Sequence, residues 1–173
     1  MNMRGVILAA GCVLSCALVT GRAQAASDMF LEISGVQGEV VTPAAFANQI
    51  QILSLSFGGS KPCSTGQISL SDLTVMKATD KATVDFAVAL RDHTVFPTAT
   101  IRFTNPSDQV YQVYQLNNAV ITSLQTSGSA GGGRTTESVS FAFSSLVVTY
   151  TYIDGAGKPG TPESTTLTAA SCP

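Results

Sequence analysis

Few side chains in this sequence could do chemistry, and His93 matters most because it is the only histidine. Any Ser-His-Asp or Cys-His arrangement would have to use it, with the adjacent Asp92 as the carboxylate. Side chains next to each other at the end of a helix usually diverge, and no Gly-x-Ser-x-Gly turn occurs in the sequence beyond residue 25. We therefore interpret His93 as a surface or helix-capping residue, and we expect no catalytic residue.

Other groups of residues that could form a catalytic, phosphate-binding or metal site are no more convincing. Asp80 and Asp85 could be proposed as a carboxylate pair for glycoside hydrolysis, but nothing in the sequence places a cleft between them. The run from Gly131 to Arg134 is rich in glycine, yet no Gly-Lys-Ser or Gly-Lys-Thr follows it, so we interpret it as a solvated loop. One histidine and two distant cysteines do not make a zinc site. We predict neither a metal site nor a cofactor.

The first residues have the pattern of an export signal. Arg4 precedes an apolar run at residues 6–19, and Ala23-Gln24-Ala25 supplies the small residues of a cleavage site, so we predict cleavage after Ala25. The alternative is a lipid-anchored Cys16 in the segment Val13-Leu14-Ser15-Cys16. The apolar run is shorter than the roughly 20 residues of a membrane-spanning helix, and no later run approaches that length. We expect an exported protein, periplasmic or secreted, without a membrane span.

Removing residues 1–25 leaves enough chain for one domain. It also leaves seven Lys and Arg against eleven Asp and Glu, since two of the nine basic residues, Arg4 and Arg22, lie in the signal. A scattered acidic excess argues against nucleic acid as a partner. We expect a folded domain at residues 26–156 and a polar C-terminal tail at residues 157–173.

Two cysteines remain outside the signal, Cys63 and Cys172, and both would lie in an oxidising compartment. A disulfide between them would close a loop of about 110 residues and contribute on the order of 4 kcal/mol. The alternative is a pair of free thiols. We treat this bond as a candidate that mass measurement with alkylation would test.

Alternating apolar residues predict a mostly β protein. Several runs change parity: Ile50 and Ile52 give way to Leu53 and Leu55, and similar changes occur near residues 70–73 and 143–146. A phase change within one strand indicates a bulge or bend, which favours a closed β-barrel of two sheets. The alternative is that each phase change separates two short strands. One helix is predicted at residues 80–91, with Asp80 as a plausible N-cap. Its wide apolar stripe, with Val84, Ala87 and Val88 on one face and Phe86, Ala89 and Leu90 on a neighbouring one, should lie against the barrel.

The order of these segments resembles one known family. The opening Asp28-Met29-Phe30-Leu31-Glu32-Ile33 runs into Gly35-Val36-Gln37-Gly38-Glu39, and further matching segments follow at residues 50–58, 69–77, 80–83 and 137–152. Together they are similar to the haemolysin-coregulated proteins (Hcp) of type VI secretion, over roughly residues 28–154. The resemblance implies a β-barrel with one flanking helix and a structural, non-catalytic role as a tube subunit or secreted effector carrier.

The resemblance also implies partners. Six copies would form a homo-hexameric ring by pairing barrel edges, and rings would stack through an extended loop, for which Gly58, Gly59, Ser60, Lys61 and Pro62 are the candidates. Secretion effectors or a spike protein would be further partners. The alternative function is an exported monomeric β-barrel binding module, and the oligomeric state of the protein separates the two hypotheses.

Overall fold

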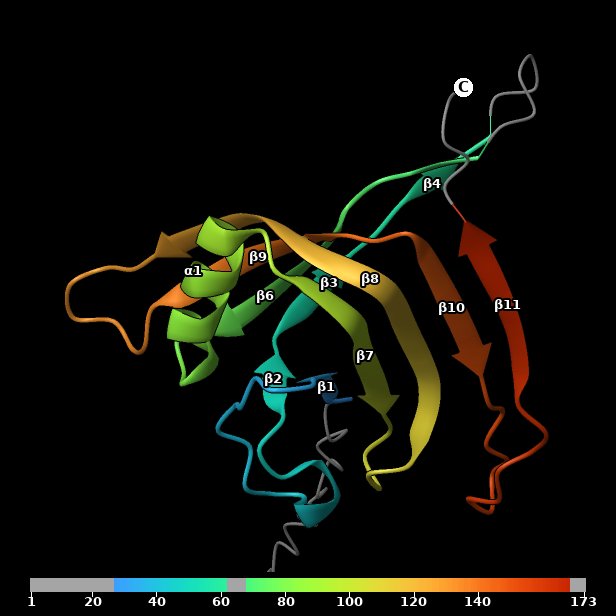
Figure 1. The fold of residues 1–173 in the computed structure, drawn as a ribbon. Coiled ribbons are helices and arrows are strands. Elements are labelled where there is room, and N and C mark those ends of the chain that lie inside the picture. Colours follow the sequence, from blue (N-terminus) through green and yellow to red (C-terminus); the bar gives the residue numbers. More distant parts are fainter. Residues whose placement is uncertain (1–26, 62–67, 169–173) are drawn as a thin grey trace, which may run out of the picture.

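Strands make up most of the fold, which a computed structural model describes for residues 27–61 and 68–168 (Figure 1). A single 3-10 turn, η1, spans Ala44–Phe46, and a single α-helix in the described part, α1, spans Ala82–Asp92. The strands are β1 (Met29–Ile33), β2 (Ile50–Ile52), β3 (Ser54–Ser56), β4 (Gly59–Ser60), β5 (Ser69–Leu70), β6 (Leu73–Ala78), β7 (Val95–Thr104), β8 (Val110–Ser127), β9 (Thr136–Ala142), β10 (Ser145–Tyr150) and β11 (Glu163–Thr168).

Nine of these strands form one antiparallel sheet. Its order is β2-β1-β7-β8-β9-β6-β3, with β10 joined to β8 and β11 joined to β10. Strand β8 organises the sheet because its 18 residues are long enough to serve two partners on one side. Its first half pairs with β10 and its second half with β9, while β7 lies along the opposite side.

The change of partner along β8 falls at Asn117 and Asn118. The Asn117 carbonyl accepts a hydrogen bond from the Ser144 backbone at 2.9 Å, and the Asn117 amide donates to the Ser145 hydroxyl at 2.9 Å. Asn118 has a φ of 50°, a left-handed conformation that asparagine tolerates better than most residues. These bonds hold the junction between β9 and β10 against β8, so β8 bends while its neighbours change.

The expectation of a closed barrel of two sheets was wrong, because the described strands form an open sheet beside a separate two-stranded hairpin. The sheet order starts at β2 and ends at β3, and no ladder joins these two within the described residues. Leu53 separates them and its N–H donates to the Met76 carbonyl at 2.7 Å. Strand β3 pairs with β6, whereas β2 pairs with β1, so no strand pairing joins the two ends of the sheet. We call this gap the unpaired seam of the sheet.

The phase changes in the sequence mostly separate short strands. Ile50–Ile52 and Ser54–Ser56 are distinct, β5 ends before β6, and β9 ends before β10. The alternative interpretation of these positions therefore describes the structure better than a set of continuous bent strands. Bulges do occur, but both lie in β8, whose pairing register shifts opposite Phe103 and Thr104 of β7 and again, against β9, between Ile121 and Ser123.

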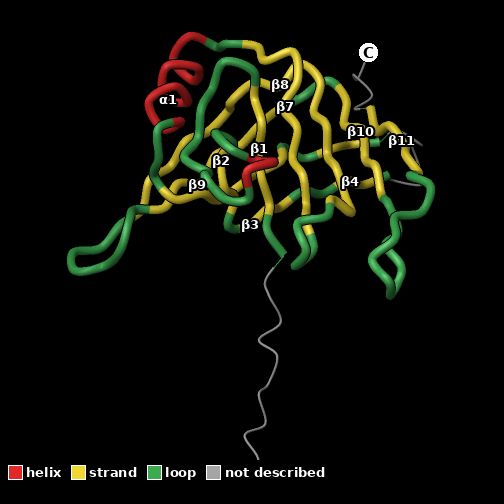
Figure 2. Tube along the Cα trace, turned by 90° about the horizontal axis from the view of Figure 1, so that it is seen from below, coloured by secondary structure: helices red, strands yellow, loops and turns green. Residues whose placement is uncertain are grey.

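The core lies between the concave side of the sheet and α1, and Figure 2 shows the helix on the opposite side of the molecule from β10 and β11. The helix was predicted correctly, but its buried face is narrower than expected. Ala82, Phe86 and Ala89 are buried, whereas Val84 and Val88 on the predicted stripe are exposed. Phe86 meets the Phe141 ring edge to face at a centroid distance of 6.1 Å. Within the described residues, no helix has the length and apolarity to cross a membrane.

Candidate functional site: assembly surfaces and a buried ion cluster

The predicted stacking loop begins as a projecting arm. Gly59 pairs with Leu70 and Ser60 with Ser69, and the arm leaves the main sheet beyond β3 (Figure 1). The Ser71 hydroxyl accepts a hydrogen bond from the Gly58 N–H at 3.0 Å and fixes the base of the arm. The structure shows Gly58, Gly59, Ser60 and Lys61 exposed on this arm. Pro62, Cys63, Cys172 and the predicted cleavage residue Ala25 lie outside the described residues.

A second surface is the open edge of the sheet. Strand β11 pairs with β10 over six residue pairs, from Ser145 and Thr168 to Tyr150 and Glu163, and has no other strand partner in the described chain. Most of its side chains are exposed. A strand with one unpaired edge presents backbone N–H and C=O groups that another chain can pair with. The expected polar tail at residues 157–173 thus contains the strand that ends the sheet.

The neighbouring half of the sheet is only partly covered. Phe103, Tyr114, Val148 and Leu167 pack against the core but remain half-buried, and the Phe103 and Tyr114 rings meet edge to face at 5.2 Å. Figures 1 and 2 show no helix of the described residues over this half. Half-buried aromatic and aliphatic side chains beside an open edge are typical of surfaces that become buried on association.

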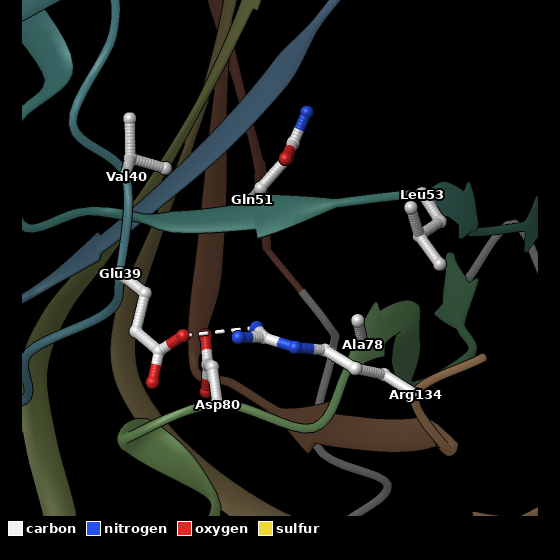
Figure 3. Close-up of a pocket in the computed structure, with 7 residues that line it drawn as sticks. All are labelled: Glu39, Val40, Gln51, Leu53, Ala78, Asp80 and Arg134. Atoms are coloured by element: carbon white, nitrogen blue, oxygen red, sulfur yellow. Dashed lines mark hydrogen bonds and ion pairs between the residues drawn. The ribbon is translucent and has the colours of Figure 1, made fainter.

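The unpaired seam of the sheet holds a small pocket of about 210 Å³, drawn in Figure 3. Gln51 and Leu53 line one side and Ala78 and Asp80 the other. Arg134 from the glycine-rich loop lies across its mouth, and its guanidinium donates to the Glu39 carboxylate at 2.9 Å. This ion pair ties together loops that are 95 residues apart in sequence. The run from Gly131 to Arg134 is therefore a surface loop anchored by one arginine.

Behind the pocket lies a buried ion cluster that the sequence reasoning missed. Lys77 has no exposed side-chain surface, and its ammonium lies 2.8 Å from Glu137 and 2.7 Å from Asp80. The Thr83 hydroxyl on α1 donates to Glu137 at 3.0 Å and accepts from Lys77 at 3.3 Å. The Asp80 carboxylate also accepts from the Ala82 N–H at 3.0 Å and so caps the helix. The cluster joins β6, β9 and α1.

Sequence parity carried a signal for this cluster. Leu73, Val75 and Lys77 are alternate residues of β6, and Lys77 occupies the third inward position. Glu137 holds the matching inward position on β9, directly opposite Lys77 in the pairing register. A lysine that continues an apolar alternation requires a buried acidic partner. Nothing in the sequence shows which acidic residue that is, because the two lie 60 positions apart.

The residues considered for catalysis are not brought together. His93 forms the C-cap of α1 with a φ of 49°, and Asp92 pairs with Arg91 at 2.7 Å. Hydrogen bonding from Arg91 lowers the pKa of Asp92, and the same bond raises the pKa of Arg91. Asp80 belongs to the buried cluster, while Asp85 is exposed on the helix. Within the described residues no group of three His, Cys, Asp or Glu side chains could hold a metal.

The fold is an antiparallel sheet with one flanking helix, a projecting arm and an open edge strand, and solved proteins of type VI secretion have the same fold. Residues 30–150 match the family described as "Type VI secretion system effector, Hcp". The chain belongs to this family of type VI secretion tube and effector proteins. The sequence resemblance to Hcp is thereby confirmed.

Individual relatives agree with this assignment. The chain is 33% identical over 136 residues to protein hcp1 of Pseudomonas aeruginosa, an alignment that covers 72% of this chain and 83% of the relative. A solved type six secretion system protein superposes with a TM-score of 0.76 at 24% identity, covering 83% of this chain and 96% of that one. Hcp1 from Salmonella typhimurium gives a TM-score of 0.70 at 20% identity, covering 83% and 95%. These two structures support the fold.

Proposed function

We propose that this protein assembles into a hexameric ring and acts as a tube subunit or effector carrier of type VI secretion. Hcp homologues form hexameric rings. The observation that supports the same assembly here is the open edge of β11 beside the half-buried surface of Phe103, Tyr114, Val148 and Leu167. Pairing of this edge with a neighbouring copy would satisfy its free backbone groups and cover the aromatic surface.

A pair of proline substitutions in β11 tests the ring. Thr165 and Thr166 are consecutive in the strand, so one directs its N–H toward β10 and the other toward the open edge. Proline removes that donor in each case. Native mass spectrometry of the unaltered protein should show hexamers. The proline variant that loses the N–H directed toward the open edge should be monomeric, with an unchanged circular dichroism spectrum. A protein that stays monomeric at high concentration, or two folded variants that both stay hexameric, would defeat the proposal.

Stacking of rings is assigned to the arm of Gly58, Gly59, Ser60, Lys61 and Pro62. It is supported by the projection of the β4–β5 hairpin away from the sheet, with Lys61 exposed near its end. Substituting Lys61 by Glu should shorten ring stacks in negative-stain images while single rings persist. Stacks of unchanged length would exclude a role for this residue. Effectors or a spike protein are the further partners proposed for the assembled ring.

The proposal also includes export of the protein and a disulfide bond. We infer cleavage after Ala25, leaving the domain at residues 26–156 and the segment at residues 157–173, with the protein periplasmic or secreted. The small residues Ala23 and Ala25 support this cleavage site. We also infer a disulfide between Cys63 and Cys172, because both cysteines would meet an oxidising compartment. Intact mass of the exported protein tests the cleavage, and alkylation with and without reductant tests the disulfide.

A further inference from the structure

The four tyrosines of the chain gather in one region of the molecule, where the β7–β8 turn meets the loop after β10. Tyr111 and Tyr114 lie on β8, Tyr150 ends β10, and Tyr152 follows two residues later. None of the four is fully buried, and Tyr150 and Tyr152 are 49% and 61% exposed. Tyrosine has an apolar ring and a polar hydroxyl, which suits a binding surface better than a core.

A β-bulge directs one of these rings. Phe103 pairs with Gln112 but Thr104 pairs with Val110, so Tyr111 is an extra residue on β8 without a partner across the ladder. The Tyr111 ring comes to a centroid distance of 6.3 Å from Phe103. Bulges of this kind reorient a side chain at the edge of a sheet and often occur next to functional sites. Tyr111 then lines a cleft that also includes Tyr150.

The cleft measures about 550 Å³, within the roughly 300–1,000 Å³ of small-molecule sites. Its walls are two loops, residues 105–109 and 153–157. The Gln109 amide donates to the Gly157 carbonyl at 2.8 Å and accepts from the Asn105 amide at 3.0 Å. The Asp154 carboxylate accepts from the Ala156 and Lys158 N–H groups at 2.9 and 2.8 Å through one oxygen, Oδ1. The two walls are thus fixed relative to each other before any ligand arrives.

Polar groups in the cleft retain bonding capacity. Among the described residues, Asp154 Oδ2, the Ser107 hydroxyl and the Tyr150 hydroxyl make no hydrogen bond. The Asn105 and Gln109 amides each carry a second N–H. No lysine or arginine is among the residues that line the cleft, which disfavours phosphate, and a single carboxylate disfavours a metal ion. Only two lining side chains, Ile153 and Ala156, are aliphatic, which disfavours an acyl chain.

We propose that this cleft binds a saccharide. A sugar ring presents C–H groups that pack on an aromatic face and hydroxyls that both donate and accept, and these match the Tyr111 and Tyr150 rings beside the Asn105, Gln109 and Asp154 polar groups. The cleft adjoins the proposed assembly surface, because Tyr150 pairs with Glu163 of β11 and the Tyr111 ring contacts Phe103. Sugar binding is therefore measured separately from ring formation. In an exported protein, cell-wall glycan is the ligand class that the cleft would meet.

Saturation-transfer NMR on the purified protein tests this, with chitotetraose and maltotetraose as the probes at millimolar concentration. We expect transfer to at least one probe, reduced about tenfold by Tyr150→Ala and by Asp154→Asn. Tyr152→Ala is the matched control, because Tyr152 is exposed like Tyr150 but does not line the cleft. Transfer that Tyr152→Ala retains and the two cleft variants lose supports the site.

Three results would overturn the proposal. The first is absence of transfer to both sugars, and the second is equal loss in Tyr150→Ala and Tyr152→Ala. The third is occupation by another copy of the chain, seen as cleft resonances that shift with protein concentration and do not respond to sugar. Asp154→Asn preserves the size of the side chain and should fold normally. An unchanged NMR spectrum of the variant protein checks this. Hexamer formation is measured separately by native mass spectrometry.

Discussion

Removing the buried cation Lys77 should destabilise this protein far more than removing a surface arginine. Lys77→Met leaves Glu137 and Asp80 facing each other without a positive charge, and their side chains are only 1% and 9% exposed. At an effective dielectric constant near 20, each contact is worth about 6 kcal/mol of gross attraction, which desolvation largely offsets. Breaking a buried pair by deleting one partner costs about 3–5 kcal/mol.

A loss of about 3–5 kcal/mol is a large part of the free energy of unfolding, which is about 5–15 kcal/mol for domains of this size. Urea unfolding at one fixed protein concentration would measure it, since assembly adds to apparent stability. The matched control is Arg102→Met, which breaks a surface pair with Glu32 in which the side chains are 28% and 53% exposed. An exposed pair contributes about 0–1 kcal/mol.

A second variant separates charge from packing. Lys77→Met combined with Glu137→Met removes both buried partners and leaves Asp80, which reaches the pocket surface and still caps the helix. The double variant should therefore be more stable than Lys77→Met alone, because no uncompensated charge remains deep in the core. If Lys77→Met costs no more than Arg102→Met, or if the double variant is the less stable of the two, this reasoning is refuted.

Three further substitutions have defined expectations, each measured by urea or thermal unfolding. Gly38→Ala should lower the free energy of unfolding by about 2 kcal/mol or more, because the added Cβ would overlap the Gln49 carbonyl oxygen. Gly155→Ala is the control and should be nearly neutral, because a Cβ at Gly155 has no neighbouring atom within 4 Å. Phe86→Ala should cost about 3–5 kcal/mol by opening a cavity under α1, and a smaller loss would mean that the core collapses into it. Arg134→Ala should cost less than about 1 kcal/mol, because the Arg134 side chain is 66% exposed, and a larger loss would show that the loop is structurally coupled to the core.

Periodicity in the sequence was enough to predict several strands and the helix, but it predicted neither β8 nor β11. Alternation at Met29, Leu31 and Ile33 matches β1, and the predicted helix at residues 80–91 differs from α1 by one or two residues at each end. Whether the sheet closes could not be predicted. The alternation of apolar residues shifts by one position at Leu53, and this shift is the same whether one strand bends there or two strands separate. The hydrogen bond from Leu53 to Met76, a long-range contact, decides between these alternatives.

The helix face was misjudged for a different reason. Val84 and Val88 are as apolar as Phe86, so composition favoured a wide buried stripe. In the structure Ala82, Phe86 and Ala89 are buried and Leu90 is partly buried against the core, whereas Val84 and Val88 are exposed. The proposed assembly surfaces could be predicted only in part: the resemblance to Hcp suggested the loop that forms the arm, but the open edge lies in a segment expected to be a polar tail. The ion cluster needed a pairing register that sequence does not supply.

The long strand β8 has a mechanical consequence. Its first half carries the β10–β11 hairpin and its second half carries β9, so one continuous backbone links the outer edge of the sheet to the side that holds α1. A pull on β11 along its length would load the parallel rows of hydrogen bonds between β11, β10 and β8 in shear, where many bonds must yield at once. Tension applied at one rim of the molecule therefore passes through β8 to the opposite rim without crossing a loop.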